Sequence, residues 1–389
     1  MNKAFFGIGK IYPLLLCLLT IAITVSNSLL AQPAGFTDDL VIDGWSQAVG
    51  VTFDKNGSMY VWEKRGKVWT VENGVKAADP LIDISEEVGN WRDFGLVGFA
   101  LDPNFLNNGY IYLWYVVDRH HLLNFGTNRY NPNASSEKEA TIARLTRYTV
   151  NFSGNTKNAD YNSRKILIGE SKSSGPPILH ESHGAGQIIF GTDGTLMVTV
   201  GDGASYTNPI DEGSNPATYY QQALVDGIIT SAQNIGAYRC QSLNNLSGKI
   251  LRIDPETGNG VPSNPYYQAI NPRSSQSRIW SIGIRNPYRI ALKPETGSHN
   301  ANKGDPGTFF FGDVGWSTWE DLNVVEKAGQ NFGWPIYEGI SQRTGFNNPN
   351  YAVSDSEHAR PKVDWRHGAD QARAFVNGNI VNIGTNGVS

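Results

Sequence analysis

A histidine and an aspartate flank a β-hairpin predicted near the middle of the chain. His183 precedes an apolar strand at 187–190, a tight turn follows at 192–194, and a second apolar strand at 196–200 ends just before Asp202. Because a hairpin returns the chain to the edge from which it left, this spacing predicts that His183 and Asp202 lie together. A carboxylate fixes the tautomer of an adjacent imidazole and stabilises the imidazolium, as a general base requires. The same pattern fits a structural histidine beside an aspartate that caps a turn.

A second group of polar residues follows further along the chain. Arg285 and Asn286 lie between two apolar runs that read as strands, and they offer a planar guanidinium and an amide that both donates and accepts. The stretch 312–323 places acids and an asparagine beside turn carbonyls, a set of oxygen ligands that suits calcium. The alternatives are a structural ion pair for Arg285 and an acidic turn with capping roles.

Four stretches share an order of elements that predicts repeated β-sheet units. Each has an apolar strand, a turn resembling Asp-x-x-Gly, a second apolar strand and an outer strand with basic flanks. The inner strand pairs are expected at 49–53 and 58–63, 96–101 and 110–117, 187–190 and 196–200, and 288–292 and 308–311, with the start of a fifth unit at 374–383 and a separate strand at 36–42. Irregular repetition of all-β units with long insertions is typical of a β-propeller, and a β-sandwich with long loops is the alternative.

Composition and the N-terminus indicate an exported protein. The chain has 389 residues and a net charge of −4, with 17% charged residues, so there is no electrostatic reason to expect nucleic acid or an anionic membrane surface as a partner. Residues 1–31 read as a secretory signal peptide, with lysines at 3 and 10, an apolar run at 14–25 and cleavage after Ala31. The mature protein is therefore expected to be soluble, secreted or periplasmic, with no membrane segment and with Cys240 as its lone cysteine.

Long polar insertions are predicted at 118–141, 206–242 and 259–277, where such loops act as functional walls or are disordered. The second insertion follows Asp202 closely and could form the wall of a cleft. His120 and His121 lie in the first insertion and are expected to be solvated. A zinc site at His180 and His183 lacks further ligands at usable spacing, and the absence of Gly-x-Ser-x-Gly disfavours an α/β-hydrolase.

Five separated motifs together resemble one family. They are HGAGQIIFGTDG with GDGAS, LSGKILRIDP, IGIRNPYRIAL, GDVGWSTWEDLNVV and QNFGWPIYEG, in this order, within residues 39–339. The set resembles the soluble PQQ-dependent sugar dehydrogenases, which form the glucose/sorbosone dehydrogenase family. Within that family it resembles the secreted bacterial branch, which is related to hedgehog-interacting proteins. The resemblance implies an all-β, six-bladed β-propeller that binds PQQ and Ca²⁺.

The resemblance also implies roles for individual residues. His183 would be the general base that takes the sugar hydroxyl proton, Asp202 would orient it, and Arg285 and Asn286 would contact the quinone. The main-chain carbonyls of Gly315 and Trp316 would hold the calcium that polarises the quinone, and Asp321 would bind a second, structural calcium. The implied reaction oxidises the anomeric carbon of an aldose to the lactone and passes electrons to an external acceptor.

The chain departs from the family pattern at several positions. Asp93 replaces the usual glutamine near the quinone, where it would repel an anionic quinol, Ser182 replaces an acid before the base, and Trp316 replaces a proline. The lysine and arginine contacts to the PQQ carboxylates in the last family blades have no counterpart before Ser389. We therefore expect a propeller domain at 36–389 that is incomplete at its C-terminus, with about four to five of six blades.

Two other functions remain open on the sequence. Asp93, Ser182 and the long insertions favour a non-catalytic propeller that binds carbohydrate or protein through a vestigial site. A secreted sugar lactonase or another hydrolase could share a central calcium, but it has no need for an arginine–asparagine pair that holds quinone oxygens.

Overall fold

The computed structural model describes residues 36–339, except 38, 154–155, 209 and 318, and the backbone of short strands between 341 and 382. The chain divides into two units, 1–44 and 45–389. The described residues of the first unit form no strand, so the strand predicted at 36–42 is wrong: Phe36, Leu40 and Val41 are largely exposed and bury no apolar face there. The predicted signal peptide lies outside the described residues. Within the described part of the chain, no helix has the length and apolarity needed to cross a membrane.

Four antiparallel sheets make up most of the second unit. The first contains β1 (Ala48–Phe53), β2 (Met59–Glu63), β3 (Lys67–Glu72), β4 (Val75–Lys76) and β5 (Ile82–Asp83). The second contains β6 (Leu96–Leu101), β7 (Tyr110–Val116), β8 (Thr141–Ser153), β9 (Thr156–Ile168) and β10 (Pro177–Ile178). The third contains β11 (Ala185–Phe190), β12 (Leu196–Val200), β13 (Lys249–Ile253) and β14 (Ile279–Ile282), and the fourth contains β15 (Arg289–Leu292), β16 (Phe309–Asp313) and β17 (Asp321–Val325).

The remaining elements are short. A hairpin of β18 (Tyr337–Glu338) and β19 (Ser341–Gln342) precedes a sheet of β20 (Val363–Asp364), β21 (Arg373–Val376) and β22 (Asn379–Asn382). The described residues of the stretch where a fifth unit is predicted to begin, 374–383, belong to β21 and β22. The helices are α2 (Phe105–Asn108), α3 (Arg119–Asn124), α4 (Tyr220–Val225) and α5 (Ser275–Arg278), with 3-10 turns η1 (Ser231–Gln233), η2 (Gly236–Gln241) and η3 (Ala301–Lys303). The all-β prediction is confirmed.

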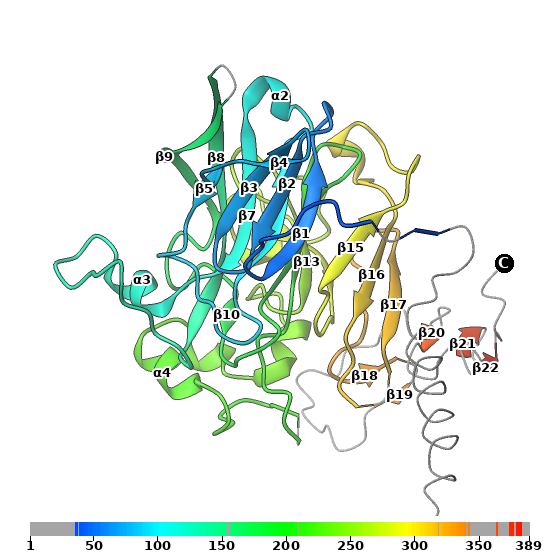
Figure 1. Cartoon of the computed structure of the whole chain (residues 1–389). Coiled ribbons are helices and arrows are strands. Elements are labelled where there is room, and N and C mark those ends of the chain that lie inside the picture. Colours follow the sequence, from blue (N-terminus) through cyan, green and yellow to red (C-terminus); the bar gives the residue numbers. More distant parts are fainter. Residues whose placement is uncertain are drawn as a thin grey trace, which may run out of the picture. The chain divides into compact units, whose positions relative to one another are not determined.

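The four sheets are arranged as the blades of a propeller (Figure 1). The first strand of each sheet contacts the first strand of the next, so β1, β6, β11 and β15 follow one another around an axis. Arg289 Nη2 on β15 donates to the main-chain oxygen of Val49 on β1 at 3.1 Å, which links the last of these strands to the first. Separate buried apolar clusters fill the space between successive sheets, as expected for blades that cannot bury both faces alone. The predicted propeller is therefore confirmed, with four blades within residues 45–339 as far as they are described.

The repeated Asp-x-x-Gly turns have a common physical basis. The carboxylate of Asp193 accepts hydrogen bonds from the main chain and hydroxyl of Thr195, at 3.0 and 2.6 Å, and closes the turn between β11 and β12. Gly194 has φ of +77°, a conformation that glycine adopts without strain. Asp193 also forms a buried ion pair with Arg252 of β13, at 2.6 Å, so the turn is fastened to the outer strand that follows.

The insertion at 118–141 is anchored by buried charge. Asp118 caps α3 by accepting from the main chain of His120 and His121, at 2.8 and 3.3 Å. His121 is 1% exposed, stacks on Phe125, and lies 3.4 Å from the buried carboxylate of Glu87. The expectation that this histidine is solvated is wrong, because α3 folds it into a cluster whose partners are distant in the sequence. The other members of that cluster are Arg144, Arg164 and Tyr148.

Burial lowers the pKa of His121 from 6.5 to about 4, since the charge of Glu87, which favours protonation, is opposed by the two arginines. The unfolded chain therefore takes up this proton between pH 6.5 and 4 while the folded chain does not. We expect the free energy of unfolding to fall by up to about 3 kcal/mol over that window and to be unaffected by this group above it. Urea unfolding as a function of pH measures this.

His121→Phe keeps the stacked ring without a titratable nitrogen and should remove that part of the acid sensitivity. The exposed His299 offers the matched control, since His299→Phe should leave the pH dependence of unfolding in place. An identical pH profile for His121→Phe and the unsubstituted protein would contradict this account.

Candidate functional site

The hairpin of β11 and β12 brings His183 and Asp202 together, as its spacing predicts. Ala185 pairs with Val200. His183 lies two residues before Ala185 and Asp202 lies two residues after Val200, so the two meet at one edge of the sheet. His183 Nδ1 lies 2.9 Å from Asp202 Oδ1, and the two residues are only 6% and 1% exposed. His183 has φ of +58°, which is uncommon for a residue with a side chain. Its carbonyl accepts from the main chain of Gly203 at 2.9 Å, which helps to hold that backbone in place.

The carboxylate of Asp202 is buried as a charged group. Its Oδ1 also accepts from the main chain of Ala204, and its Oδ2 accepts from Trp334 Nε1, each at 2.9 Å. Burial alone would raise the pKa of Asp202, but the charge and hydrogen bond of His183, the charge of Arg285 and the Ala204 hydrogen bond hold it below its ordinary value. The carboxylate is thus available to fix His183 with a proton on Nδ1, which leaves Nε2 as the acceptor nitrogen.

Arg285 and Asn286 form a corner between β14 and β15 beside this pair. The main chain of Asp202 donates to the Arg285 carbonyl at 2.8 Å, so the two predicted groups of residues are adjacent. Asp313 of β16 accepts from the main chain of Arg285 and Asn286, at 3.0 and 2.6 Å. Burial raises the pKa of Asp313 to about 7 against these hydrogen bonds. The guanidinium of Arg285 lies 5.3 Å from the ring centre of Trp334.

A pocket of about 320 Å³ opens at this end of the axis, and we call it the site pocket. Apart from Lys64, which follows β2, its walls come from residues that precede or belong to the first strand of each blade, which is why positions far apart in sequence meet there. They are Val49, Lys64, Arg92, Asp93, Phe94, Val97, His183, Gly184, Ala185, Asn286 and Tyr288. The structure therefore brings Asp93 and Asn286 into one cavity with His183. Arg285 is not in this lining and instead contacts the Val314 and Gly315 carbonyls.

Two cations of the site pocket, Lys64 and Arg92, were not identified from the sequence. Lys64 Nζ donates to the Arg92 carbonyl at 2.5 Å, and Arg92 Nε lies 3.4 Å from a carboxylate oxygen of Glu181. Lys64 follows β2 and Arg92 precedes β6, so only the propeller arrangement places them next to His183. With Asp93 as the one acid of the lining, these side chains favour an anionic ligand.

The insertion that follows Asp202 begins beside the dyad, but none of its residues lines the site pocket, so the cleft wall predicted for it is not seen there. Tyr206 donates to Glu181 at 2.6 Å, and its ring packs edge-on against His180 at 4.7 Å. Trp316 Nε1 donates to the Tyr206 carbonyl at 2.7 Å. Behind the dyad, Arg239 of the same insertion donates to the Asp202 and Gly203 carbonyls, at 3.3 and 3.2 Å.

A buried lysine, Lys249, holds the insertion at 206–242 in place. Lys249 Nζ donates to the carbonyls of Arg239, Cys240 and Ser247, at 2.7–2.8 Å. The free thiol of Cys240 is fully buried beside Gly248, where an added Cβ would lie 2.2 Å from Sγ. Gly248 therefore has to be glycine for steric reasons as well as for its φ of +64°.

The predicted calcium ligands are differently engaged. Arg285 Nη1 donates to the Gly315 carbonyl at 3.1 Å and to that of Val314 at 2.8 Å, so a guanidinium already lies on this turn. Asp321 pairs with Asp313 across β16 and β17. In the described part of the chain no group of three or more His, Cys, Asp or Glu side chains is placed to hold a metal ion. The calcium roles of residues 315, 316 and 321 therefore stay predictions, with the Gly315 carbonyl already bound by Arg285.

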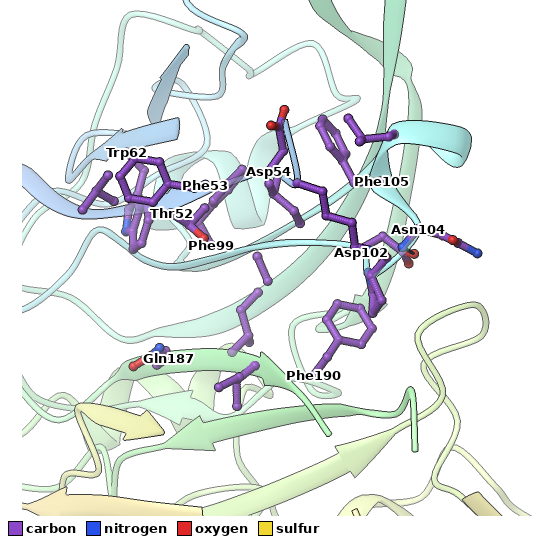
Figure 2. Close-up of a pocket in the computed structure, with 18 of the residues that line it drawn as sticks. Thr52, Phe53, Asp54, Trp62, Phe99, Asp102, Asn104, Phe105, Gln187 and Phe190 are labelled. Atoms are coloured by element: carbon purple, nitrogen blue, oxygen red, sulfur yellow. Dashed lines mark hydrogen bonds between the residues drawn. The ribbon is translucent and has the colours of Figure 1, made fainter. Parts of the chain in front are cut away.

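A second pocket of about 530 Å³ lies where β1, β6 and β11 end, away from the site pocket (Figure 2). Its apolar walls include Phe53, Trp62 and Phe190. Its acids serve their own turns: Asp54 accepts from the main chain of Asn56 and Ser58, at 2.9 and 3.0 Å, and Asp102 accepts from that of Asn104 at 2.8 Å. This pocket therefore offers no reactive pair of side chains, and the smaller site pocket is the chemical candidate.

The fold and the site together define the class of protein: a β-propeller with an imidazole–carboxylate pair at one end of its axis. The sequence profile of the Glucose / Sorbosone dehydrogenase family matches residues 45–382, and the chain belongs to this family. The aldose sugar dehydrogenase of Streptomyces coelicolor, solved with PQQ bound, shares the fold with a TM-score of 0.52 and 20% identity, covering 88% of this chain and 83% of that one.

Curated relatives divide into enzymes and proteins without a stated activity. The HIPL1 protein of Arabidopsis thaliana is 25% identical over 68% of this chain and 36% of its own length. Quinoprotein glucose dehydrogenase B of Acinetobacter calcoaceticus is 22% identical over 86% of this chain and 59% of its own length. The human hedgehog-interacting protein is 25% identical over 67% of this chain and 32% of its own length. The chain thus spans between about a third and three fifths of these relatives.

The contact between Arg285 and the Gly315 carbonyl predicts competition with a cation at this turn. Arg285→Gln removes the guanidinium and frees two carbonyl oxygens. We expect calcium at about 1 mM, the range of weak extracellular sites, to raise the melting temperature of this variant more than that of the unsubstituted protein. Magnesium, which demands smaller octahedral geometry, is the control ion. Equal calcium shifts in both proteins would show that the guanidinium does not block the site.

Proposed function

We propose that this protein is a quinone-dependent sugar dehydrogenase that oxidises the anomeric carbon of an aldose to the lactone with PQQ. One observation carries the proposal: the His183–Asp202 pair and the Arg285–Asn286 corner lie at the same end of the propeller axis, joined by a main-chain hydrogen bond of 2.8 Å. Family membership supports sugar oxidation as the reaction class.

His183 would act as the general base. Asp202 engages Nδ1, and His183 lines the site pocket, so Nε2 is the nitrogen that would accept the proton of the anomeric hydroxyl. Asp202, held as a carboxylate, would stabilise the imidazolium that forms. Bound PQQ would supply a two-electron acceptor for the hydride that leaves the same carbon, and an external acceptor would reoxidise it.

The residues present fit a quinone with carboxylate groups. Arg285 Nε is buried with no hydrogen-bond acceptor among the described residues, but Arg285 lies outside the site-pocket lining, so a contact with a quinone oxygen would require its side chain to move. Asn286 lines the site pocket, and Lys64 and Arg92 would offset the cofactor's negative charge. Asp93 in the same lining opposes this and would favour the less anionic, oxidised form. Calcium enters the proposal only through the family resemblance, and no step here depends on it.

The proposal predicts a large effect at His183 and a small one at the neighbouring imidazole. His183→Asn keeps a residue type that tolerates positive φ but removes the base, and should lower kcat by at least about 100-fold. His180→Gln alters a ring that contacts Ser182 and Tyr206 rather than the acid, and should change kcat by less than about tenfold. Reconstitution with PQQ, with and without calcium, followed by aldose oxidation with an artificial acceptor, measures both. If the unsubstituted protein oxidises no aldose under these conditions, or if His183→Asn keeps full activity, the proposed reaction is wrong.

A second prediction concerns the cations of the site pocket. Lys64→Gln should weaken PQQ binding about fivefold at low salt, and the difference should shrink as salt is added, because the interaction is electrostatic. Lys55→Gln is the matched control, since Lys55 likewise donates to a main-chain carbonyl, Pro103 at 2.8 Å, but lines the second pocket. Calorimetric titration of PQQ gives both affinities. Equal affinities for the two variants would remove Lys64 from the cofactor site.

A non-catalytic binding propeller is the second candidate. Asp93 in the site pocket and the similarity to a protein described as hedgehog-interacting favour it. Carbohydrate or protein binding that His183→Asn leaves unchanged, without sugar oxidation, would establish it.

Export completes the proposal. The charged and apolar pattern of residues 1–31 supports a secreted or periplasmic protein. N-terminal sequencing of the exported chain, expected to begin at Gln32, decides this point.

A further inference from the structure

Trp334 contacts both halves of the candidate site. Its indole Nε1 donates to Asp202 Oδ2 at 2.9 Å, and its ring centre lies 5.3 Å from the guanidinium carbon of Arg285. The side chain is buried, at 4% exposed. Trp334 belongs to the NFGWP stretch after β17, so its position in the sequence is remote from the hairpin that carries the dyad.

The main chain of Trp334 is fixed on two sides. Its N–H donates to the Gly283 carbonyl at 3.0 Å, just after β14, and its carbonyl accepts from Gln241 Nε2 at 2.7 Å. Gln241 and Asn331 exchange side-chain hydrogen bonds at 3.1 and 2.8 Å, which orients the Gln241 amide. The indole is therefore held between the insertion behind the dyad and the strand that leads to Arg285.

Tryptophan combines two properties that this position uses. The indole nitrogen only donates, so its hydrogen bond stabilises the ionised form of a buried carboxylate. The ring face attracts a guanidinium through its quadrupole. Phenylalanine would keep much of the packing and the face but would lose the donor.

We propose that Trp334 is a positioning residue that ties the carboxylate of Asp202 to the guanidinium of Arg285, so that the base and the quinone-side corner keep one relative arrangement. The catalytic consequence of this inference rests on the proposed function. The coupling of Trp334 to the two side chains does not. Besides Arg285, ionisable groups that interact with Asp202 are those of His180, His183, Arg239 and Cys240.

Double-mutant cycles on the free energy of unfolding test the coupling without any activity assay. Trp334→Phe should destabilise the protein, and its effect on the unfolding equilibrium constant should be about five- to tenfold smaller in an Asp202→Asn background, where no charge remains for the donor to stabilise. In an Arg285→Gln background the effect should be about threefold smaller, because the cation is absent.

Trp280 provides a matched control. It is 1% exposed, its ring lies 5.1 Å from the guanidinium of Arg252, and its Nε1 has no hydrogen-bond partner within the described residues. Trp280→Phe should destabilise the protein by lost packing, additively with Asp202→Asn and Arg285→Gln. Additivity of Trp334→Phe in either cycle, or coupling as large for Trp280→Phe, would overturn the proposal.

If Trp334→Phe does not fold, Trp334→His gives the second variant. Its Nε2–H can occupy the ring position of the indole N–H while the larger ring is lost, so coupling to Asp202 should persist while coupling to Arg285 should fall. Loss of the Asp202 coupling in this variant would contradict the proposed donor role.

The sugar oxidation assay separates the coupling through Trp334 from its catalytic consequence. In the active enzyme Trp334→Phe should lower kcat about tenfold and leave the KM for the sugar nearly unchanged, since the substitution alters alignment rather than sugar contacts. If the unsubstituted protein oxidises no sugar but the double-mutant cycles are non-additive, the proposed function is wrong. The coupling of Trp334 to Asp202 and Arg285 would then still hold.

Discussion

The candidate site depends on a single buried negative charge. Asp202 is almost inaccessible to water, and an isolated carboxylate in such a place would take up a proton. Here it stays ionised because an imidazole, a main-chain amide and an indole all bind it, with Arg285 nearby. Each of these partners comes from a different segment, so keeping one charge ionised requires four parts of the chain to be in place together. The chemistry proposed for His183 follows from that requirement.

The propeller provides this convergence through its topology. Every blade begins with a strand beside the axis, and the residues just before these strands are collected at one end. Asp93, His183 and Asn286 reach the site pocket in this way, and Lys64 joins them from the turn that follows β2. At the other end of the same strands, the aspartates close turns and use their hydrogen-bonding capacity locally. The two ends of the axis thus differ in which polar groups remain available to a ligand.

The sequence predicted the features that depend on neighbouring residues. The hairpin between residues 183 and 202, the Asp-x-x-Gly turns and the inner strands of all four blades could be inferred because their patterns are local. The strand β9 was missed, since its polar sequence has no apolar alternation and it is held by pairing with β8. His121 was placed in solvent because the acid and arginines around it lie on other elements. The bond from Trp334 to Asp202 spans 132 residues, and only the folded chain reveals it.

The thiol of Cys240 gains a use from where it lies. It is the one free cysteine of the described residues, it packs against Gly248, and it lies in η2, the segment whose Arg239 supports the dyad. Burial raises the pKa of this thiol well above its ordinary value, so the sulfur is unreactive while the segment stays closed. A thiol reagent would consequently modify the protein only during transient openings of that segment. The rate of modification would report how often the segment that supports Asp202 opens.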